Sequence, residues 1–391
     1  MSAGAAPAEP AAGRLGSSFA GIFAVTFCGL IAVGAVLPVL PRYVRGPIGA
    51  GDLAVGIVIG AYAITGLLLR PVAGRLADRW GRKPTVLLGA LLLGVSGLLN
   101  LPSLGIAGLI VARLVLGVGE GSLYTAGSAW IVDMAPLARR GRVLGLYGLA
   151  VWGGLSVGPL AGELLLEASS YRAVWIFAAA MPFLGALIAT RVPERFEPIA
   201  HSEPHPLIAP EAVRPGFAVA LASIGYAAVA AFIVLHLEAR GVGHGATVFG
   251  AFAAMIVITR LIAGDLPDRV GAARVAIGAT LVEAAGLLII ALAHSLPVAL
   301  AGGLAMGAAF SLLNPSLMLI AVNRVSESAR GAAMGTFTAF FDAGVGIGAP
   351  LAGLAAALSD YEGAFLLAAA ISVGSAALIL VTLHSRAASA C

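Results

Sequence analysis

Several charged side chains lie inside long apolar segments of this chain, where the surroundings favour chemistry over solvation. Arg113 and Glu120 share the apolar segment 104–132 and stand seven residues apart, which is two helical turns, so both project towards the same interior. Asp342 lies in the middle of the segment 332–356. An ionisable group inside a membrane is costly and marks an ion or substrate pathway by default. We therefore predict that Arg113, Glu120 and Asp342 form a proton-coupling or substrate site.

Two structural roles are the alternatives for such charges. Arg113 and Glu120 would also serve as an ion pair that only stiffens their helix. Glu283 is another mid-segment carboxylate, in 273–293, and we expect it to have a structural role.

The composition of the chain indicates the class of protein and therefore the kind of element on which these charged residues lie. Of 391 residues, 60% are hydrophobic and 11% are charged, and the mean hydropathy is +1.01. These values exclude an ordinary soluble domain and predict a polytopic membrane protein. The net charge of +4 does not indicate nucleic-acid binding, because the basic residues stand singly or in short loops between apolar segments.

Breaks at charges, prolines and glycine clusters divide the chain into twelve predicted membrane-spanning helices. They cover residues 18–41, 51–73, 84–101, 104–132, 144–166, 173–191, 216–236, 246–264, 273–293, 297–322, 332–356 and 363–384. Sixteen Lys and Arg residues, fourteen outside these helices and Arg191 and Arg274 at or beside a helix end, fall on the side of the 74–84 loop, and four fall on the other side. We therefore expect a multi-pass protein of the cell membrane with both termini in the cytoplasm.

The predicted helices fall into two sets of six. A proline-rich hydrophilic stretch, 192–215, separates an N-terminal bundle, 18–191, from a C-terminal bundle, 216–391, and residues 1–17 are predicted to be a disordered cytoplasmic tail. His201 and His205 belong to this linker, and Cys28 and Cys391 have no metal-binding spacing, so we expect no metal site.

A dense run of charge at residues 74–84 has the pattern Gly-x-Leu-x-Asp-Arg-x-Gly-Arg-Lys, and we expect it to be a short turn at the cytoplasmic face. The pattern closely resembles the loop 2–3 signature of the major facilitator superfamily of secondary transporters. The resemblance implies an all-helical fold with twelve transmembrane helices in two pseudo-symmetric six-helix bundles, without enzymatic activity or cofactor. It also implies a conformational latch, in which Asp78 meets the start of the eleventh helix near Gly331 and Arg82 pairs with Asp133. The latch residues are Gly74, Asp78, Arg79, Gly81, Arg82 and Asp133.

The charged run has a weaker echo 190 residues later, which predicts that the two halves are repeats. The matched pairs are Arg70 with Arg260, Gly74 with Gly264, Asp78 with Asp268, Arg79 with Arg269, Gly81 with Gly271, Gly117 with Gly307, Gly154 with Gly344, and Gly158 with Gly348. The second copy has alanines where the first has Arg82 and Lys83.

The fifth predicted helix carries a glycine motif. Gly154, Gly158, Pro159 and Gly162 resemble a pattern that marks the drug/proton antiporters of the superfamily, although Glu163 replaces its last glycine. The glycines predict close helix packing, and the proline predicts a bend. Residues 154–158, with Ser156 between Gly154 and Gly158, also match the Gly-x-Ser-x-Gly elbow of serine hydrolases, but no strand precedes them, so we disfavour a hydrolase.

We therefore predict a monomeric secondary transporter that exports small amphipathic or cationic compounds by alternating access, driven by protons. Its partners would be a small-molecule substrate, protons and the lipid bilayer, with no nucleic acid. Candidate cavity-lining residues are Tyr62, Tyr124, Trp152, Tyr226 and Asn314. A carrier for a sugar or another small metabolite is the alternative within transport, and a non-transporting membrane receptor is the alternative outside it.

Overall fold

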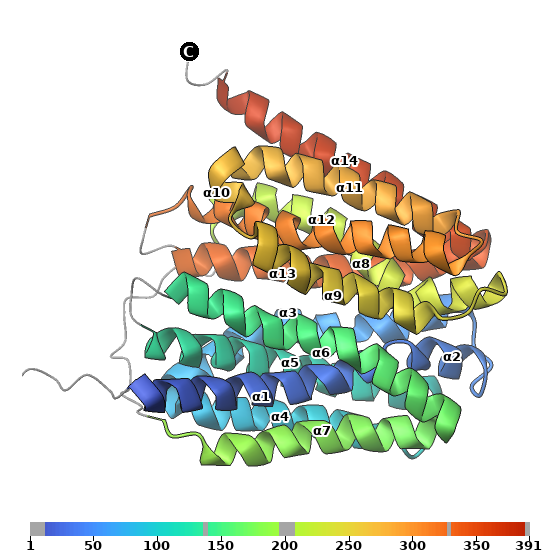
Figure 1. Ribbon diagram of the computed structural model, residues 1–391, viewed down its shortest axis with the longest axis horizontal. Coiled ribbons are helices and arrows are strands. Elements are labelled where there is room, and N and C mark those ends of the chain that lie inside the picture. Colours follow the sequence, from blue (N-terminus) through green and yellow to red (C-terminus); the bar gives the residue numbers. More distant parts are fainter. Residues whose placement is uncertain (1–11, 136–139, 195–207, 327–329, 388–391) are drawn as a thin grey trace, which may run out of the picture.

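The computed structural model describes residues 12–135, 140–194, 208–326 and 330–387 (Figure 1). Within these residues every regular element is a helix, and there is no strand. The helices are α1 (Ala12–Val36), α2 (Val39–Arg45), α3 (Asp52–Trp80), α4 (Arg82–Leu99), α5 (Gly105–Met134), α6 (Arg140–Ala168), α7 (Tyr171–Arg191), α8 (Pro210–Ala239), α9 (Gly245–Ala263), α10 (Leu266–Val270), α11 (Ala272–Ala291), α12 (Leu296–Val322), α13 (Arg330–Leu358) and α14 (Tyr361–Ala387). Twelve segments of the described chain are long and apolar enough to cross a membrane, with α1 and α2 counting as one. The predicted all-helical class and span number are confirmed.

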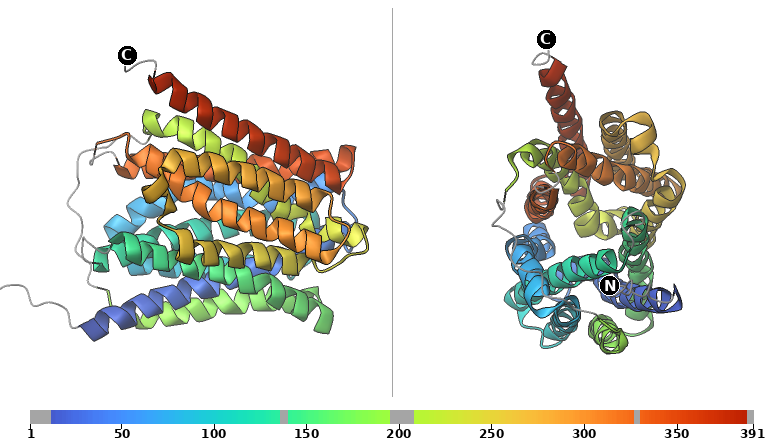
Figure 2. Two further views of the ribbon diagram at one scale, coloured as in Figure 1. Left: turned by 45° about the horizontal axis from the view of Figure 1, so that its top comes forward. Right: turned by 90° about the vertical axis from the view of Figure 1, so that its left-hand side faces the viewer.

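The helices form two groups along the chain. In the first, α1 packs against α6 and α7, α4 packs against α5 and α7, and α3 packs against α5. In the second, α8 packs against α13 and α14, α11 packs against α12 and α14, and α9 packs against α12. The end-on view in Figure 2 shows the blue-to-green helices of the first group beneath the yellow-to-red helices of the second. The groups touch mainly where α3 crosses α13 and α6 crosses α9.

The internal repeat reappears in the helix contacts. A Cβ atom on Gly117 would lie 2.0 Å from the carbonyl oxygen of Tyr62, and one on Gly307 would lie 2.3 Å from that of Phe252. Both residues of the second contact stand 190 positions after those of the first. Small residues let helix backbones approach this closely in a membrane. The second half therefore repeats the first in packing as well as in sequence.

The charged run is not the turn expected from the sequence. Helix α3 continues through residues 74–80, and the break is Gly81 alone, whose φ of +108° is a conformation that favours glycine. Helix α4 begins at the next residue, Arg82. A helix satisfies its own backbone hydrogen bonds as it leaves the membrane, so polar side chains do not require it to end.

The tail and the linker differ from expectation in the same direction. Helix α1 begins at Ala12, so residues 12–17 are helical although they were expected to belong to the disordered tail, while residues 1–11 lie outside the described part. Of the predicted linker 192–215, residues 195–207 lie outside the described part, and α8 already begins at Pro210. Proline is well suited to this first helical position because its missing N–H would have no partner there.

Candidate functional site between the two halves

Arg70 of α3 and Asp342 of α13 join the two halves through an ion pair. The arginine Nε and Nη2 atoms each donate to one carboxylate oxygen, with both distances 3.1 Å. The Asp342 side chain is 5% exposed and the Arg70 side chain 20%. A two-point arginine–carboxylate contact fixes orientation as well as distance. Asp342 is therefore held by a charge from the opposite half, and the sequence analysis did not identify this partner.

Glycines let α3 and α13 approach closely enough for this contact. A Cβ atom on Gly60 would lie 2.9 Å from the carbonyl oxygen of Gly346, and one on Gly56 would lie 2.3 Å from that of Ala349. The equivalent crossing of α6 and α9 includes a hydrogen bond in which the Ser156 hydroxyl donates to the carbonyl oxygen of Gly250, at 3.1 Å. Ser156 thus lies within a helix and serves helix packing, which gives no support to a hydrolase elbow.

Arg113 is almost fully buried, at 2% exposed, and is poorly satisfied. Its Nη2 atom donates to the carbonyl oxygen of Ile59 at 3.2 Å, and its Cζ atom lies 5.2 Å from the centre of the Tyr62 ring. The Nε and Nη1 atoms have no partner among the described residues. The pairing with Glu120 considered from the sequence does not form here, because a separation of seven residues corresponds to about 10 Å of helix rise.

Arg113 and Glu120 nevertheless reach the same pocket at the centre of the molecule. Helices of both halves contribute, with Tyr62 from α3 and Tyr226 from α8 among the lining residues. The remaining lining residues are apolar: Val33, Leu37, Ile59, Leu116, Leu155, Ala230 and Val345. Glu120 is half-buried and forms no ion pair or hydrogen bond with the described residues. We call this space the central pocket.

The other predicted lining residues, Trp152, Tyr124 and Asn314, are not among the residues that line the central pocket. The Trp152 ring lies 6.2 Å from the Tyr226 ring and 5.6 Å from the Phe310 ring, centroid to centroid, in an aromatic cluster beside the pocket. The Tyr124 ring stacks with the Tyr147 ring, and the centroid of the Tyr124 ring lies 5.9 Å from the Cζ atom of Arg70. Asn314 is half-buried in α12 and does not line the central pocket.

A third arginine of the membrane interior, Arg260 of α9, is the repeat counterpart of Arg70. Its Nη1 atom would lie 3.2 Å from a Cβ atom on Gly148 of α6, so its side chain reaches the opposite half as Arg70 does. Within the described residues it forms no ion pair. The sequence analysis recorded this residue only as an echo.

The halves are also tied together at the end of the molecule that carries α2, on the right in Figure 1. Arg42 of α2 contacts Glu163 of α6 and Glu238 of α8, and the Tyr361 hydroxyl donates to Asp52 at 3.1 Å. Glu163, which departs from the glycine motif, therefore has an ionic partner. This end is closed by polar contacts between the halves.

At the opposite end the latch residues contact one another within the first half. Arg82 binds Asp78 and also donates through Nε to Asp133 at 2.9 Å. Glu194 accepts hydrogen bonds from the backbone N–H groups of Arg82 and Lys83, the latter at 3.0 Å, and so caps α4. Asp78 thus pairs with Arg82, and no contact with the start of α13 is found among the described residues. Gly74 is half-buried and Arg79 is exposed.

The glycine motif of α6 packs against α1. A Cβ atom would lie 2.8 Å from the Ile31 nitrogen if placed on Gly154, 2.6 Å from the Ile31 oxygen on Gly158, and 2.1 Å from the Ala35 oxygen on Gly162. Pro159 lies inside the same helix. The motif therefore shapes a contact inside the first half, away from the charges of the central pocket.

Glu283 of α11 lies apart from the central pocket. It is fully buried, both carboxylate oxygens lack a partner among the described residues, and it faces Gly225 and Leu287 inside the second half. Its structural role stays a prediction.

Comparison with known proteins identifies the family of this chain. Residues 22–266 and 216–390 match the family model of the Major Facilitator Superfamily. The chain belongs to this superfamily. An uncharacterized MFS-type transporter of Pseudomonas aeruginosa is 34% identical over 372 residues, covering 92% of each chain, and one of Salmonella typhimurium is 33% identical over 376 residues, covering 93% of this chain and 96% of the relative. This chain is therefore a multi-pass membrane transporter and not an enzyme.

Solved structures of the superfamily share the fold at low sequence identity. The human organic anion transporter MFSD10 (TETRAN) aligns with a TM-score of 0.72 and 18% identity over 95% of this chain and 100% of that chain. The nucleoside transporter NupG aligns with a TM-score of 0.74 and 14% identity over 94% and 99%. These identities establish the fold of this superfamily member and leave its substrate open.

Proposed function

We propose that this superfamily member is a proton-coupled exporter of small amphipathic compounds, acting as a monomer in the cell membrane with both termini in the cytoplasm. The observation that carries the proposal is the ion pair between Arg70 and Asp342, because it joins the two halves inside the membrane. A proton on Asp342 removes one partner's charge and so weakens the link on which the relative position of the halves depends.

The contacts between the halves support alternating access. At the end with α2, Arg42 of the first half contacts Glu238 of the second, whereas at the other end Asp78 pairs with Arg82 of its own half. With basic residues assigned to the cytoplasm, this conformation opens inward. The outward-open state would break the contact between Arg42 and Glu238, and Asp78 would reach α13, which is the latch implied by the superfamily resemblance.

Transport would then proceed by exchange of partners. A compound binds in the central pocket, and rocking of one half against the other moves the opening of the pocket across the membrane. Protonation of Asp342 frees Arg70, and Glu120, which has no ionic partner, offers a second acid beside the pocket. A ligand or proton shifts the equilibrium between the inward-open and outward-open states only if it binds the two states with different affinity. Because Asp342 contacts Arg70 of the opposite half, its affinity for a proton depends on the relative position of the halves.

The direction of transport rests on the α6 motif. Gly154, Gly158, Pro159 and Gly162 resemble the antiporter pattern, and their contacts with α1 supply a packing reason for keeping them. Proton-coupled uptake of a sugar or another small metabolite is the alternative.

The test uses the full chain in proteoliposomes with an acidic interior. Accumulation of a panel of amphipathic compounds is followed with and without the pH gradient, while a dye trapped inside reports proton exit. We expect gradient-dependent accumulation that Asp342→Asn slows about tenfold or more and that Asp265→Asn, which alters an exposed carboxylate, preserves. Accumulation that ignores the gradient, or that is undiminished in Asp342→Asn, would contradict the proposed coupling.

A further inference from the structure

We propose that the central pocket takes a small organic anion, whose carboxylate or equivalent oxyanion binds Arg113 while its apolar body contacts the surrounding side chains. This inference rests on the proposed function and narrows its substrate class. It also replaces the cationic compounds expected from the sequence.

The first argument is the unsatisfied guanidinium of Arg113. The residue is 2% exposed, and its Nε and Nη1 atoms have no partner among the described residues. A buried charge is costly unless it is paired and hydrogen-bonded, and unpaired buried groups of this kind call for an explanation. The planar fork of arginine matches the two oxygens of a carboxylate. An anionic ligand would supply the missing partner.

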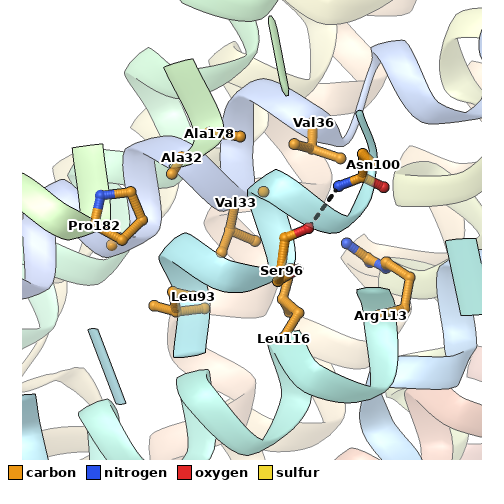
Figure 3. A pocket seen from close by; sticks show the side chains of 12 residues that line it. Ala32, Val33, Val36, Leu93, Ser96, Asn100, Arg113, Leu116, Ala178 and Pro182 are labelled. Atoms are coloured by element: carbon orange, nitrogen blue, oxygen red, sulfur yellow. Dashed lines mark hydrogen bonds between the residues drawn. The ribbon is translucent and has the colours of Figure 1, made fainter. Parts of the chain in front are cut away.

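The narrow pocket beside Arg113 has no acid in its lining, and Glu120, the one acid that lines the central pocket, forms no ion pair with Arg113. Figure 3 shows its guanidinium reaching into a narrow pocket opposite Ser96 and Asn100. The Ser96 hydroxyl already donates to the carbonyl oxygen of Ala112 at 2.8 Å, and Asn100 Nδ2 donates to the carbonyl oxygen of Ser96 at 2.9 Å. Arg113 itself, with Val33 and Leu116, lines both this narrow pocket and the central pocket. An anion in the central pocket therefore meets the guanidinium where the two spaces adjoin.

The charges between the halves add up in the same direction. The ionisable groups here are Arg70 of α3, Arg113 and Glu120 of α5, Arg260 of α9 and Asp342 of α13. Arg70 and Asp342 pair with each other, Arg113 and Glu120 both line the central pocket, and Arg260 adds a positive charge at the contact between the halves, outside the pocket lining. A surplus of positive charge attracts an anion and repels a cation. Export of an anion is also favoured by an inside-negative membrane potential.

The remainder of the central pocket is lined by apolar groups. Its free volume in this conformation is about 20 Å³, little more than one water molecule needs, so the pocket must widen as the halves move to take the apolar body of a ligand. Leu37, Ile59, Leu116, Leu155 and Val345 supply aliphatic surface. The rings of Tyr62 and Tyr226 supply aromatic surface from opposite halves. Few polar groups with many apolar neighbours are typical of sites for small amphipathic ligands.

The inference is tested by binding to the purified full chain in detergent, where no gradient exists. Matched sets that differ only in the polar group are compared: 3-phenylpropionate, 3-phenylpropionamide and 3-phenylpropylamine, and octanoate, octanamide and octylamine. We expect the carboxylates to raise the thermal unfolding midpoint of the wild type by a few degrees in a dose-dependent manner. The amides and amines at the same concentrations should leave the midpoint unchanged.

Variants separate a ligand site from a structural role. Arg113→Met should lose the response to carboxylates and, without ligand, should unfold at or above the wild-type temperature, because an unpaired buried charge has been removed. Arg113→Lys should bind carboxylates about tenfold more weakly because it lacks the fork. Asp265→Asn, at an exposed carboxylate outside the pocket, should keep the response. Preference for amines, absence of binding by any carboxylate, a response retained in Arg113→Met, or destabilisation of unliganded Arg113→Met would each overturn the inference.

The outcome is distinguishable from a failure of the proposed function. Carboxylate binding without gradient-driven transport would leave the anion site in place and remove proton coupling. Gradient-driven transport of amines without carboxylate binding would leave proton coupling in place and remove the anion site.

Discussion

Arg70 and Asp342 are 272 positions apart in the chain and form a two-point contact, with both donor–acceptor distances 3.1 Å. The contact connects the second membrane span of one half to the fifth of the other, and each residue is the partner that the other needs inside an apolar interior. Its loss therefore has consequences for stability as well as for transport.

The ion pair makes a stability prediction. Arg70→Met leaves Asp342 buried without a partner, and breaking a buried pair from one side costs about 3–5 kcal/mol. The double variant Arg70→Met with Asp342→Leu removes both charges and should recover most of that loss. Thermal unfolding of the purified proteins measures both effects. Equal destabilisation in the single and double variants would show that the charges are not coupled.

The same pair makes a pH prediction. Asp342→Asn carries no ionisable group at this position, so the rate of gradient-driven transport should fall about tenfold or more and should lose its dependence on pH. Rates are measured in proteoliposomes between pH 5 and 8. The exposed pair of Asp265 and Arg269 provides the matched control, since Asp265→Asn should reproduce the wild-type pH profile. An unchanged profile in Asp342→Asn would remove this residue from the coupling path.

The ionic contacts of Arg42 predict a conformational effect. Arg42→Gln removes the contacts to Glu163 and Glu238 and should favour opening at the α2 end. A cysteine introduced by Ala230→Cys in the central pocket, in a background lacking the native cysteines, should then react several-fold faster with an impermeant maleimide added outside cells. Arg172→Gln, at an exposed arginine of the same end, is the control. Identical labelling rates in all three backgrounds would mean that Arg42 does not hold this end closed.

The Asp78 latch makes a prediction about rate. Asp78→Asn keeps the shape of the side chain but loses its charge towards Arg82 and, in the outward-open state, towards the start of α13. Transport should fall while the amount of protein in the membrane stays unchanged, as measured by uptake and by quantitative immunodetection. Wild-type transport rates would refute a latch role for Asp78.

The sequence predicts the charges of the site but not their pairing. Arg113, Glu120 and Asp342 stand out because charges inside apolar segments are rare, and that signal is local. The partner of Asp342 depends on which helices of the two halves touch, and no spacing along the chain encodes this. Arg70 was noticed only through its counterpart Arg260. Arg70 and Arg260 occupy equivalent positions in the two repeats, 190 residues apart. Had the fold been known, this equivalence would have placed both arginines at the contact between the halves.

The sequence does not predict the ionic contacts at the α2 end, for a related reason. From the sequence, Arg42 is only one of four basic residues on its side, and Glu238 lies in the connection after the predicted helix 216–236. Helix number and order, in contrast, follow from hydropathy because a membrane permits few alternatives to a helix. The boundary at the charged run was wrong because charge marks the membrane surface and not the end of a helix.

Glu163 and Gly162 are neighbours in α6 with different predicted sensitivities. A Cβ atom on Gly162 would lie 2.1 Å from the Ala35 oxygen, so Gly162→Val must push α6 from α1 and should cost at least about 1–3 kcal/mol and lower the folded yield. Glu163→Gly opens no such clash but removes an Arg42 contact, so it should fold and transport at a reduced rate, matching Glu163→Gln. Detergent-phase size exclusion and transport assays separate the two effects. Full activity in Glu163→Gly would show that the carboxylate contributes nothing to closing this end, and a normal yield of Gly162→Val would refute the close contact with α1.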